Sequence, residues 1–266
     1  MSSNAGSFLD RLFSVDGKVV IVTGASRGIG HAIAEGFVRA GARVYICSRS
    51  AEDSKSVADQ LSEFGVIEAI QADLSSVDGC VRFADAVKAR ESRVDVLINN
   101  AGGTWAEELD TYPEAEWDAV MNVNLKSAFY LTQQVLPLLV AAASPESPAR
   151  IINVGSIRGY IVPNRPSFAY TASKGALHQL TRHLAAQLAP KSITANVLAP
   201  GVYESKMKQT VANPTQDSST ATIIPLKRLA AADDICGVAI FLASRASSYL
   251  TGSVIPVDGG VGVATN

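Results

Sequence analysis

Short apolar runs rich in β-branched residues recur along the chain and alternate with longer segments that have helical periodicity. The apolar runs cover residues 18–23, 43–47, 66–71, 94–98, 150–154, 193–198 and 253–257. Most of them are apolar at consecutive positions, a pattern typical of strands buried on both faces of a sheet. We therefore predict seven strands of one parallel sheet.

The segments between these runs have the length and spacing of helices. They cover residues 30–40, 54–64, 77–90, 114–143 and 170–188. Strands that alternate with helices form right-handed parallel crossovers, so the pattern predicts an α/β fold with a doubly wound sheet and helices on both faces. Because no linker interrupts the alternation, we predict a single domain over residues 17–262, preceded by an N-terminal arm over residues 1–16.

Two segments interrupt the alternation. Residues 144–149 read as a surface turn, and residues 202–225 form a polar stretch before the last strand. Long irregular connections after a strand often carry binding functions. We expect the second segment to be a substrate loop.

Composition narrows the function classes. The chain has 266 residues, of which 47% are hydrophobic and 18% charged, with a net charge of −2. A charged share below the usual ~25% indicates deep layers or surface shared with other subunits. The two signs of charge are interspersed, which disfavours nucleic-acid binding. The longest strongly apolar stretch, residues 135–143, is far short of the ~20 residues that span a bilayer.

The cysteines and the N-terminal sequence indicate the compartment. Cys47, Cys80 and Cys236 are odd in number and widely spaced, without a Cys-x-x-Cys pair. This pattern favours a reducing compartment over a disulfide framework or a zinc site. The first residues lack the basic and apolar regions of a secretion signal. We expect a cytoplasmic protein with no metal and no membrane partner.

A glycine-rich segment follows the first strand. Glycines here permit a tight turn and let backbone N–H groups approach a pyrophosphate, although they could instead serve only the strand-to-helix turn. The position after the first strand of a βαβ unit favours dinucleotide binding. The candidate residues in this segment are Gly24, Ser26, Arg27, Gly28, Ile29 and Gly30.

The ends of the second and third strands indicate which dinucleotide binds. NAD sites usually carry a carboxylate after the second strand, whereas an arginine accommodates the 2′-phosphate of NADP. Here the second strand ends in Ser48 and Arg49, with Arg27 nearby in the glycine loop. Asp73 and Leu74 follow the third strand, where the adenine would lie. We predict NADPH/NADP+ as the cofactor.

Polar residues also follow the fourth and fifth strands and open the helix after them. Ser156 follows the fifth strand, and Tyr170 and Lys174 are four residues apart, on one face of the predicted helix. A phenol has a pKa of about 10, and a nearby ammonium together with a positive nicotinamide stabilises its anion. Tyr170 could then act as general acid toward a carbonyl, with Ser156 hydrogen-bonded to the same oxygen.

In this order, the motifs resemble those of the short-chain dehydrogenase/reductase family over residues 17–260. The resemblance implies a Rossmann-type fold with Tyr170 as acid/base and Ser156 orienting the substrate. It also implies that Lys174 binds the nicotinamide ribose and lowers the tyrosine pKa, and that Asn124 holds a water in a relay to Lys174. The motifs that carry the resemblance are residues 24–30, Asp73, Asn99, Asn100, Ala101, Gly102, Asn124, Ser156, Tyr170, Lys174, Pro200, Gly201 and residues 256–260.

The resemblance has further implications and two departures. It implies homotetramers in which the helices over 114–143 and 170–188 pair across a two-fold axis. Ser156 stands one residue farther from Tyr170 than is usual, and Val202 replaces the usual Thr after Pro-Gly, so the carboxamide contact could fall to Ser205 or to the Val202 backbone. Residues 144–156 and 251–260 resemble rhamnolipid-type 3-oxoacyl carrier-protein reductases and related microbial carbonyl reductases.

Side chains that leave the carboxyl ends of strands are candidates for the substrate wall. Trp105 and Tyr160 could equally serve packing. Glu204 could favour a protonated amine or simply face solvent, and Arg158 could recognise an acidic carrier protein. The candidates are Trp105, Ser156, Arg158, Tyr160, Tyr203, Glu204 and Met207.

The sequence therefore favours an NADPH-dependent reductase that converts a small, bulky or cyclic ketone, including an amino-ketone, to a secondary alcohol. The alternative substrate is a 3-oxoacyl thioester on a carrier protein. The presence of Ser156, Tyr170 and Lys174 together disfavours a non-catalytic NADPH sensor. The spacing of Tyr170 and Lys174 by four residues disfavours a methyltransferase.

Overall fold

The computed structural model describes residues 3–162, 164–203 and 221–264. In this part of the chain, seven parallel strands form one sheet in the order β3-β2-β1-β4-β5-β6-β7. Each predicted strand is confirmed, with ends displaced by two residues at most. The strands are β1 Val19–Thr23, β2 Arg43–Ser48, β3 Ile67–Gln71, β4 Val96–Asn99, β5 Ala149–Val154, β6 Ile193–Pro200 and β7 Val254–Val257.

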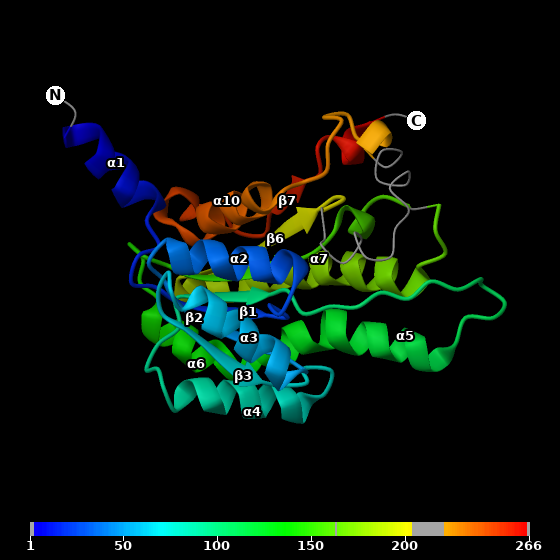
Figure 1. The fold of residues 1–266 in the computed structure, drawn as a ribbon, viewed down its shortest axis with the longest axis horizontal. Helices are drawn as coiled ribbons and strands as arrows, with labels where there is room; N and C mark the ends of the chain where they lie inside the picture. Colours follow the sequence, from blue (N-terminus) through cyan, green and yellow to red (C-terminus); the bar gives the residue numbers. More distant parts are fainter. Residues whose placement is uncertain (1–2, 163, 204–220, 265–266) are drawn as a thin grey trace.

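Helices cover both faces of the sheet, as the doubly wound prediction requires (Figure 1). One face carries α2 Gly28–Arg39, α3 Ala51–Leu61 and α10 Ala232–Ala243, and the other carries α4 Val77–Lys88, α6 Ser127–Ala142 and α7 Phe168–Leu188. Along β1, Val20 and Val22 pack into the core on the α2 face, whereas Ile21 packs into the core on the α4 face. Burial on both faces explains why the strands are apolar at consecutive positions.

The segment predicted as one helix over residues 114–143 is divided into three parts. It consists of α5 Glu114–Met121, a π-helix at Asn122–Lys126 and then α6. The predicted helix is confirmed over this segment, and the π-turn inside it was not predicted. Single π-turns inside α-helices occur frequently at functional sites.

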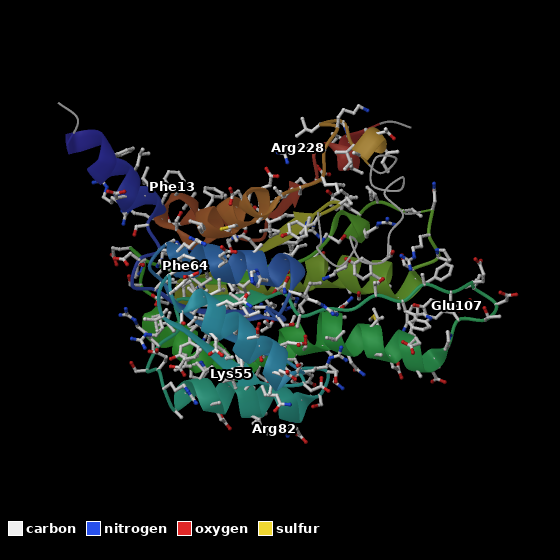
Figure 2. The ribbon with its side chains drawn as sticks, in the orientation of Figure 1. Phe13, Lys55, Phe64, Arg82, Glu107 and Arg228 are labelled. Atoms are coloured by element: carbon white, nitrogen blue, oxygen red, sulfur yellow. The ribbon has the colours of Figure 1, made fainter. Side chains whose placement is uncertain are left out.

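The N-terminal arm contains a helix, α1 Ser3–Phe13, that contacts the 3-10 turn at Arg245–Ser247. Figure 2 shows Phe13 on α1 and Glu107 on the loop after β4 at opposite ends of the molecule. Within the predicted substrate loop, Tyr203 pairs with Ala230 in an isolated parallel bridge, and residues 204–220 lie outside the described residues.

The strand order reverses between β1 and β4, which are neighbours although β2 and β3 lie between them in the chain. In open α/β sheets, ligands bind in the crevice at the carboxyl ends of strands at such a reversal. No helix of the described residues combines the length and the apolar character needed to cross a membrane.

Candidate active site

A cleft of about 1270 Å³ opens at the carboxyl ends of β1 to β4. It is lined by all the cofactor-binding residues that were predicted after these four strands. They are Gly24, Ser26, Arg27, Gly28, Ile29, Gly30, Ser48, Arg49, Asp73, Leu74, Asn100, Ala101 and Gly102.

The three glycines of the first turn have two different uses. A Cβ on Gly24 would lie 2.8 Å from the Cα of Ala101, and a Cβ on Gly30 would collide with the Asn100 amide. Gly28 has φ +60, and no heavy atom of the described residues lies within 4 Å of where its Cβ would be. Gly24 and Gly30 therefore permit close packing, whereas Gly28 leaves open space at the N-terminus of α2.

That N-terminus suits an anion. Its N-cap residue, Arg27, makes no side-chain capping hydrogen bond, so the N–H groups of the first helical turn are available to a ligand. Free N–H groups and the helix dipole together bind phosphate. The open space beside Gly28 and the uncapped helix fit a pyrophosphate.

Two exposed cations also line the cleft. Arg27 lies at the N-terminus of α2 and Arg49 follows β2, and neither forms an ion pair with a carboxylate of the described residues. The pKa of Asp73 is lowered chiefly by hydrogen bonding with Ser75 and also by the charge of Arg49. Two cations without a carboxylate at the end of β2 fit a 2′-phosphate.

Asn100 connects the glycine loop to β4. Its Nδ2 donates to the carbonyl of Thr23 at 2.8 Å and to that of Gly24 at 3.1 Å. The Thr23 hydroxyl accepts from the backbone N–H groups of Asn100 and Ala101, both at 2.9 Å. The residues predicted as cofactor ligands after β4 thus also hold the walls of the cleft together.

The predicted catalytic residues lie together between β5 and α7. Lys174 is 5% exposed, and its Nζ donates to the carbonyl of Val154 at 2.7 Å and lies 5.7 Å from the centre of the Tyr170 ring. Ser156, at the end of β5, accepts at its hydroxyl from the backbone N–H of Arg158 at 3.1 Å and hydrogen-bonds with Tyr170. The structure therefore brings Ser156, Tyr170 and Lys174 to one place.

Burial controls the protonation of these groups. Desolvation raises the pKa of Tyr170, while the hydrogen bond with Ser156 and the charge of Arg158 lower it by less. Desolvation lowers the pKa of Lys174 to about 8. The sequence argument expected Lys174 to lower the phenol's pKa. In the protein without cofactor, the pKa of Tyr170 is raised and not lowered, because desolvation of the phenol outweighs the charges near it.

Asn124 lies in the π-helix and is 2% exposed. Its Oδ1 accepts from the N–H of Gly103 at 2.8 Å, and its Nδ2 donates to the Gly103 carbonyl at 3.0 Å and to the Ser173 hydroxyl at 2.9 Å. The side chain thus ties the loop after β4 to the helix that carries Tyr170. A water held by Asn124 stays a prediction.

The cofactor residues predicted at the end of β6 and directly after it lie outside the cleft lining, as do Tyr170 and Lys174. The N–H of Gly201 donates to the carbonyl of Val257 at 3.0 Å, and a Cβ on Gly201 would lie 2.7 Å from the Cα of Asp258. The carbonyl of Val202 accepts from Ala230 at 3.1 Å. Pro200, Gly201 and Val202 thus connect β6 to the segments beside it.

The substrate-wall candidates divide into three groups. Arg158 lies close enough to Tyr170 for its charge to act on the phenol. Trp105 and Tyr160 are 39% and 47% exposed at the carboxyl edge. Glu204 and Met207 lie outside the described residues.

Several residues near the site were missed by the sequence analysis. Glu116 and Asp118 from α5, and Ser50 and Asp53 beside Arg49, also line the cleft. Ser173 lies between Tyr170 and Lys174 in the sequence, but nothing in the sequence indicates that its hydroxyl bonds Asn124. Across the described residues, no group of three His, Cys, Asp or Glu side chains could hold a metal ion.

A family model described as "Enoyl-(Acyl carrier protein) reductase" matches residues 24–262. The chain belongs to the short-chain dehydrogenase/reductase family and is an oxidoreductase of that family.

The chain is similar to two oxidoreductases, one of which is matched both by its sequence and by its solved structure. The rhamnolipids biosynthesis 3-oxoacyl-[acyl-carrier-protein] reductase of Pseudomonas aeruginosa is 46% identical over 93% of this chain and 97% of its own length. A solved RhlG/NADP active-site complex from Pseudomonas aeruginosa has a TM-score of 0.92 at 44% identity, covering 95% of this chain and 99% of that one. A gluconate 5-dehydrogenase from Burkholderia cenocepacia, solved with NADP and tartrate, has a TM-score of 0.88 at 33% identity, covering 97% and 100%. Both solved neighbours are NADP complexes, in agreement with the predicted cofactor.

Proposed function

We propose that this protein is an NADP(H)-dependent reductase that converts a ketone to a secondary alcohol. The observation that carries the proposal is the meeting of Ser156, Tyr170 and Lys174 beside a cleft built for a dinucleotide. A sensor that only binds the nucleotide has no need of a half-buried phenol beside a buried hydroxyl and a buried ammonium.

The residues around the cleft have distinct tasks toward the cofactor. The first turn of α2 would bind the pyrophosphate, Arg27 and Arg49 would hold the 2′-phosphate, and Asp73 would contact the adenine. Lys174, on α7 beside Tyr170, would hold the nicotinamide ribose. When bound, NADPH supplies the hydride that reduces the ketone carbon.

Residues of the protein supply the proton that the reduction requires. Ser156 hydrogen-bonds the carbonyl oxygen as negative charge develops on it, and Tyr170 donates the phenolic proton to that oxygen. Because burial keeps Tyr170 protonated in the protein alone, the acid is in its proton-donating form before substrate arrives. The charges of Lys174 and Arg158 stabilise the phenolate that the transfer leaves behind.

The substrate is either a small, bulky or cyclic ketone or a 3-oxoacyl thioester on a carrier protein. The relative at 46% identity supports the thioester. Arg158 also supports it, because a cation near Tyr170 favours a substrate with an anionic group over a protonated amino-ketone. We further propose a cytoplasmic homotetramer with the catalytic domain at residues 17–262.

The test is consumption of NADPH and of NADH with a panel of carbonyl compounds. The panel contains 3-oxoacyl thioesters, neutral cyclic ketones and an amino-ketone. We expect carbonyl-dependent oxidation of NADPH and much slower oxidation of NADH. NADPH binding without turnover of any compound would instead indicate a sensor, and absence of NADPH binding would overturn the proposal.

A further inference from the structure

A series of hydrogen bonds, of which the central one between Asn124 and Ser173 is fully buried, joins three elements around the proposed active site. The backbone of Gly103 exchanges two hydrogen bonds with the side chain of Asn124, at 2.8 and 3.0 Å. Asn124 Nδ2 donates to the Ser173 hydroxyl at 2.9 Å, and that hydroxyl donates to the carbonyl of Tyr170 at 2.7 Å. The series thus runs from the loop after β4, through the π-helix, to α7.

In this series of hydrogen bonds, Ser173 joins the π-helix to α7. It is 0% exposed, and its hydroxyl acts as acceptor toward Asn124 and as donor toward Tyr170. Without the hydroxyl, Asn124 keeps both hydrogen bonds to Gly103 and loses its attachment to α7. A buried N–H of its amide would then have no partner, which is costly.

The three elements joined through Ser173 carry the cofactor cleft on one side and the proposed catalytic residues on the other. Gly103 directly follows the cleft residues Asn100, Ala101 and Gly102, and Gly103 itself lines the cleft. Tyr170 and Lys174 stand on either side of Ser173 in α7. A displacement of α7 relative to the loop would therefore alter the distance between the phenol and a ligand in the cleft.

We propose that Ser173 is a positioning residue that fixes the helix of Tyr170 and Lys174 against the cofactor loop through Asn124. Its kinetic consequence rests on the proposed function. Small errors of placement have large effects on rate, because the reacting groups must be held in a near-attack geometry.

The same helix provides a matched control in Thr181. Thr181 is 0% exposed, its hydroxyl accepts from Asn153 Nδ2 at 2.8 Å, and it donates to the carbonyl of Leu177 at 2.7 Å. This is the arrangement of Ser173, two helical turns farther along α7. Asn153 lies in β5, and neither Asn153 nor Thr181 lines the cleft.

The kinetic test compares Ser173→Ala with Thr181→Val. Both substitutions remove a buried hydroxyl, so both should lower the melting temperature. We expect Ser173→Ala alone to lower kcat, by about tenfold, which corresponds to roughly the loss of one hydrogen bond. KM for the ketone should change by less than about twofold, because substrate contacts remain. Equal losses of kcat in the two variants would overturn the proposal.

A second readout needs no activity. Hydrogen exchange measured by mass spectrometry on the protein alone should be faster around Gly103 and over Asn122–Lys126 in Ser173→Ala, and unchanged there in Thr181→Val. Unchanged exchange in Ser173→Ala would show that the link does not hold the loop. If the wild-type protein reduces no carbonyl compound, the proposed function fails, while the exchange measurement still decides the role of Ser173.

Discussion

Arg49 stands at the end of β2, where a carboxylate would select NAD, and together with Arg27 it leaves the adenosine end of the cleft positively charged. The sequence was sufficient to find both arginines because strand order and a short motif fix their place. It was not sufficient to find Asp53 in the same lining, since this residue lies in the first turn of α3 and reaches the cleft only through folding.

We predict that Arg49→Asp lowers the preference for NADPH over NADH by about a hundredfold, since a charge-assisted hydrogen bond contributes roughly 1.5–3 kcal/mol and a carboxylate would also repel the phosphate. The measurement is kcat/KM for each cofactor with one ketone. Arg245→Asp, at an exposed arginine on the turn that contacts α1, is the control and should leave the ratio unchanged. An unchanged ratio in Arg49→Asp would remove the argument for the 2′-phosphate site.

His178 shows what a sequence cannot reveal about a single residue. No pattern in the sequence singles it out, and the structure buries it to 3% exposure against Gly155 and Gly159, where any Cβ would collide with the imidazole. Burial is the main cause that lowers the pKa of His178 from 6.5 to about 4, and the charges of Lys174 and Arg182 add to it.

The pKa of His178 predicts a loss of stability in acid. The unfolded chain takes up a proton near pH 6.5, whereas the folded protein does so only near pH 4, so stability falls as the pH is lowered through this range. The loss attributable to this group is at most roughly 3–4 kcal/mol, at about 1.4 kcal/mol for each pKa unit. Denaturant unfolding as a function of pH should show a shallower loss for His178→Asn than for His183→Asn, on the exposed side of the same helix. Identical slopes would contradict this assignment.

At the scale of elements, the sequence predicted the seven strands well because continuous apolar runs reflect burial on both faces. The π-turn at Asn122–Lys126 was missed because its cause is tertiary: Asn124 bonds Gly103 and Ser173, which are distant in the chain. Helix α10 was not predicted either. The aromatic contacts of Tyr112 with Trp117 and Phe168 likewise depend on folding.

Gly28, in the turn from β1 into α2, can be substituted to test whether this turn binds the cofactor's phosphates. Gly28→Ala places a methyl group in the open space beside the helix N-terminus, so we expect NADPH affinity to fall at least about tenfold. The left-handed φ of +60 should also cost roughly 1–2 kcal/mol of stability. Gly17, with φ +68 and equally open surroundings before β1, is the matched control. Gly17→Ala should lower the melting temperature similarly and leave affinity intact, and equal affinities in the two variants would argue against a phosphate site at Gly28.

For the whole molecule, the low charged fraction agrees with a sheet covered on both faces. The low charged fraction also agrees with exposed apolar side chains on α5 and α6. The family resemblance implies that these helices pack against a second subunit. Trp117 on α5 and Phe129 and Val140 on α6 are each about 40% exposed, at 39%, 40% and 44%. Side chains of this kind on one helical segment suit burial against a second copy.

We predict a native mass of about 112 kDa, four times the 27.9 kDa of one chain, by light scattering. Phe129→Glu should dissociate the assembly, because an unpaired charge cannot be buried in an apolar interface. Lys55→Glu, at an exposed side chain on α3, is the control and should not change the mass. A wild-type mass near that of one chain would contradict the tetramer.

Proton donation by Tyr170 is tested by Tyr170→Phe, which removes the phenolic oxygen and leaves the aromatic ring. NADPH binding, followed by nicotinamide fluorescence, should stay within about threefold of wild type, while the single-turnover rate of ketone reduction should fall by a factor on the order of 10³. Retention of the full single-turnover rate in Tyr170→Phe would contradict the account.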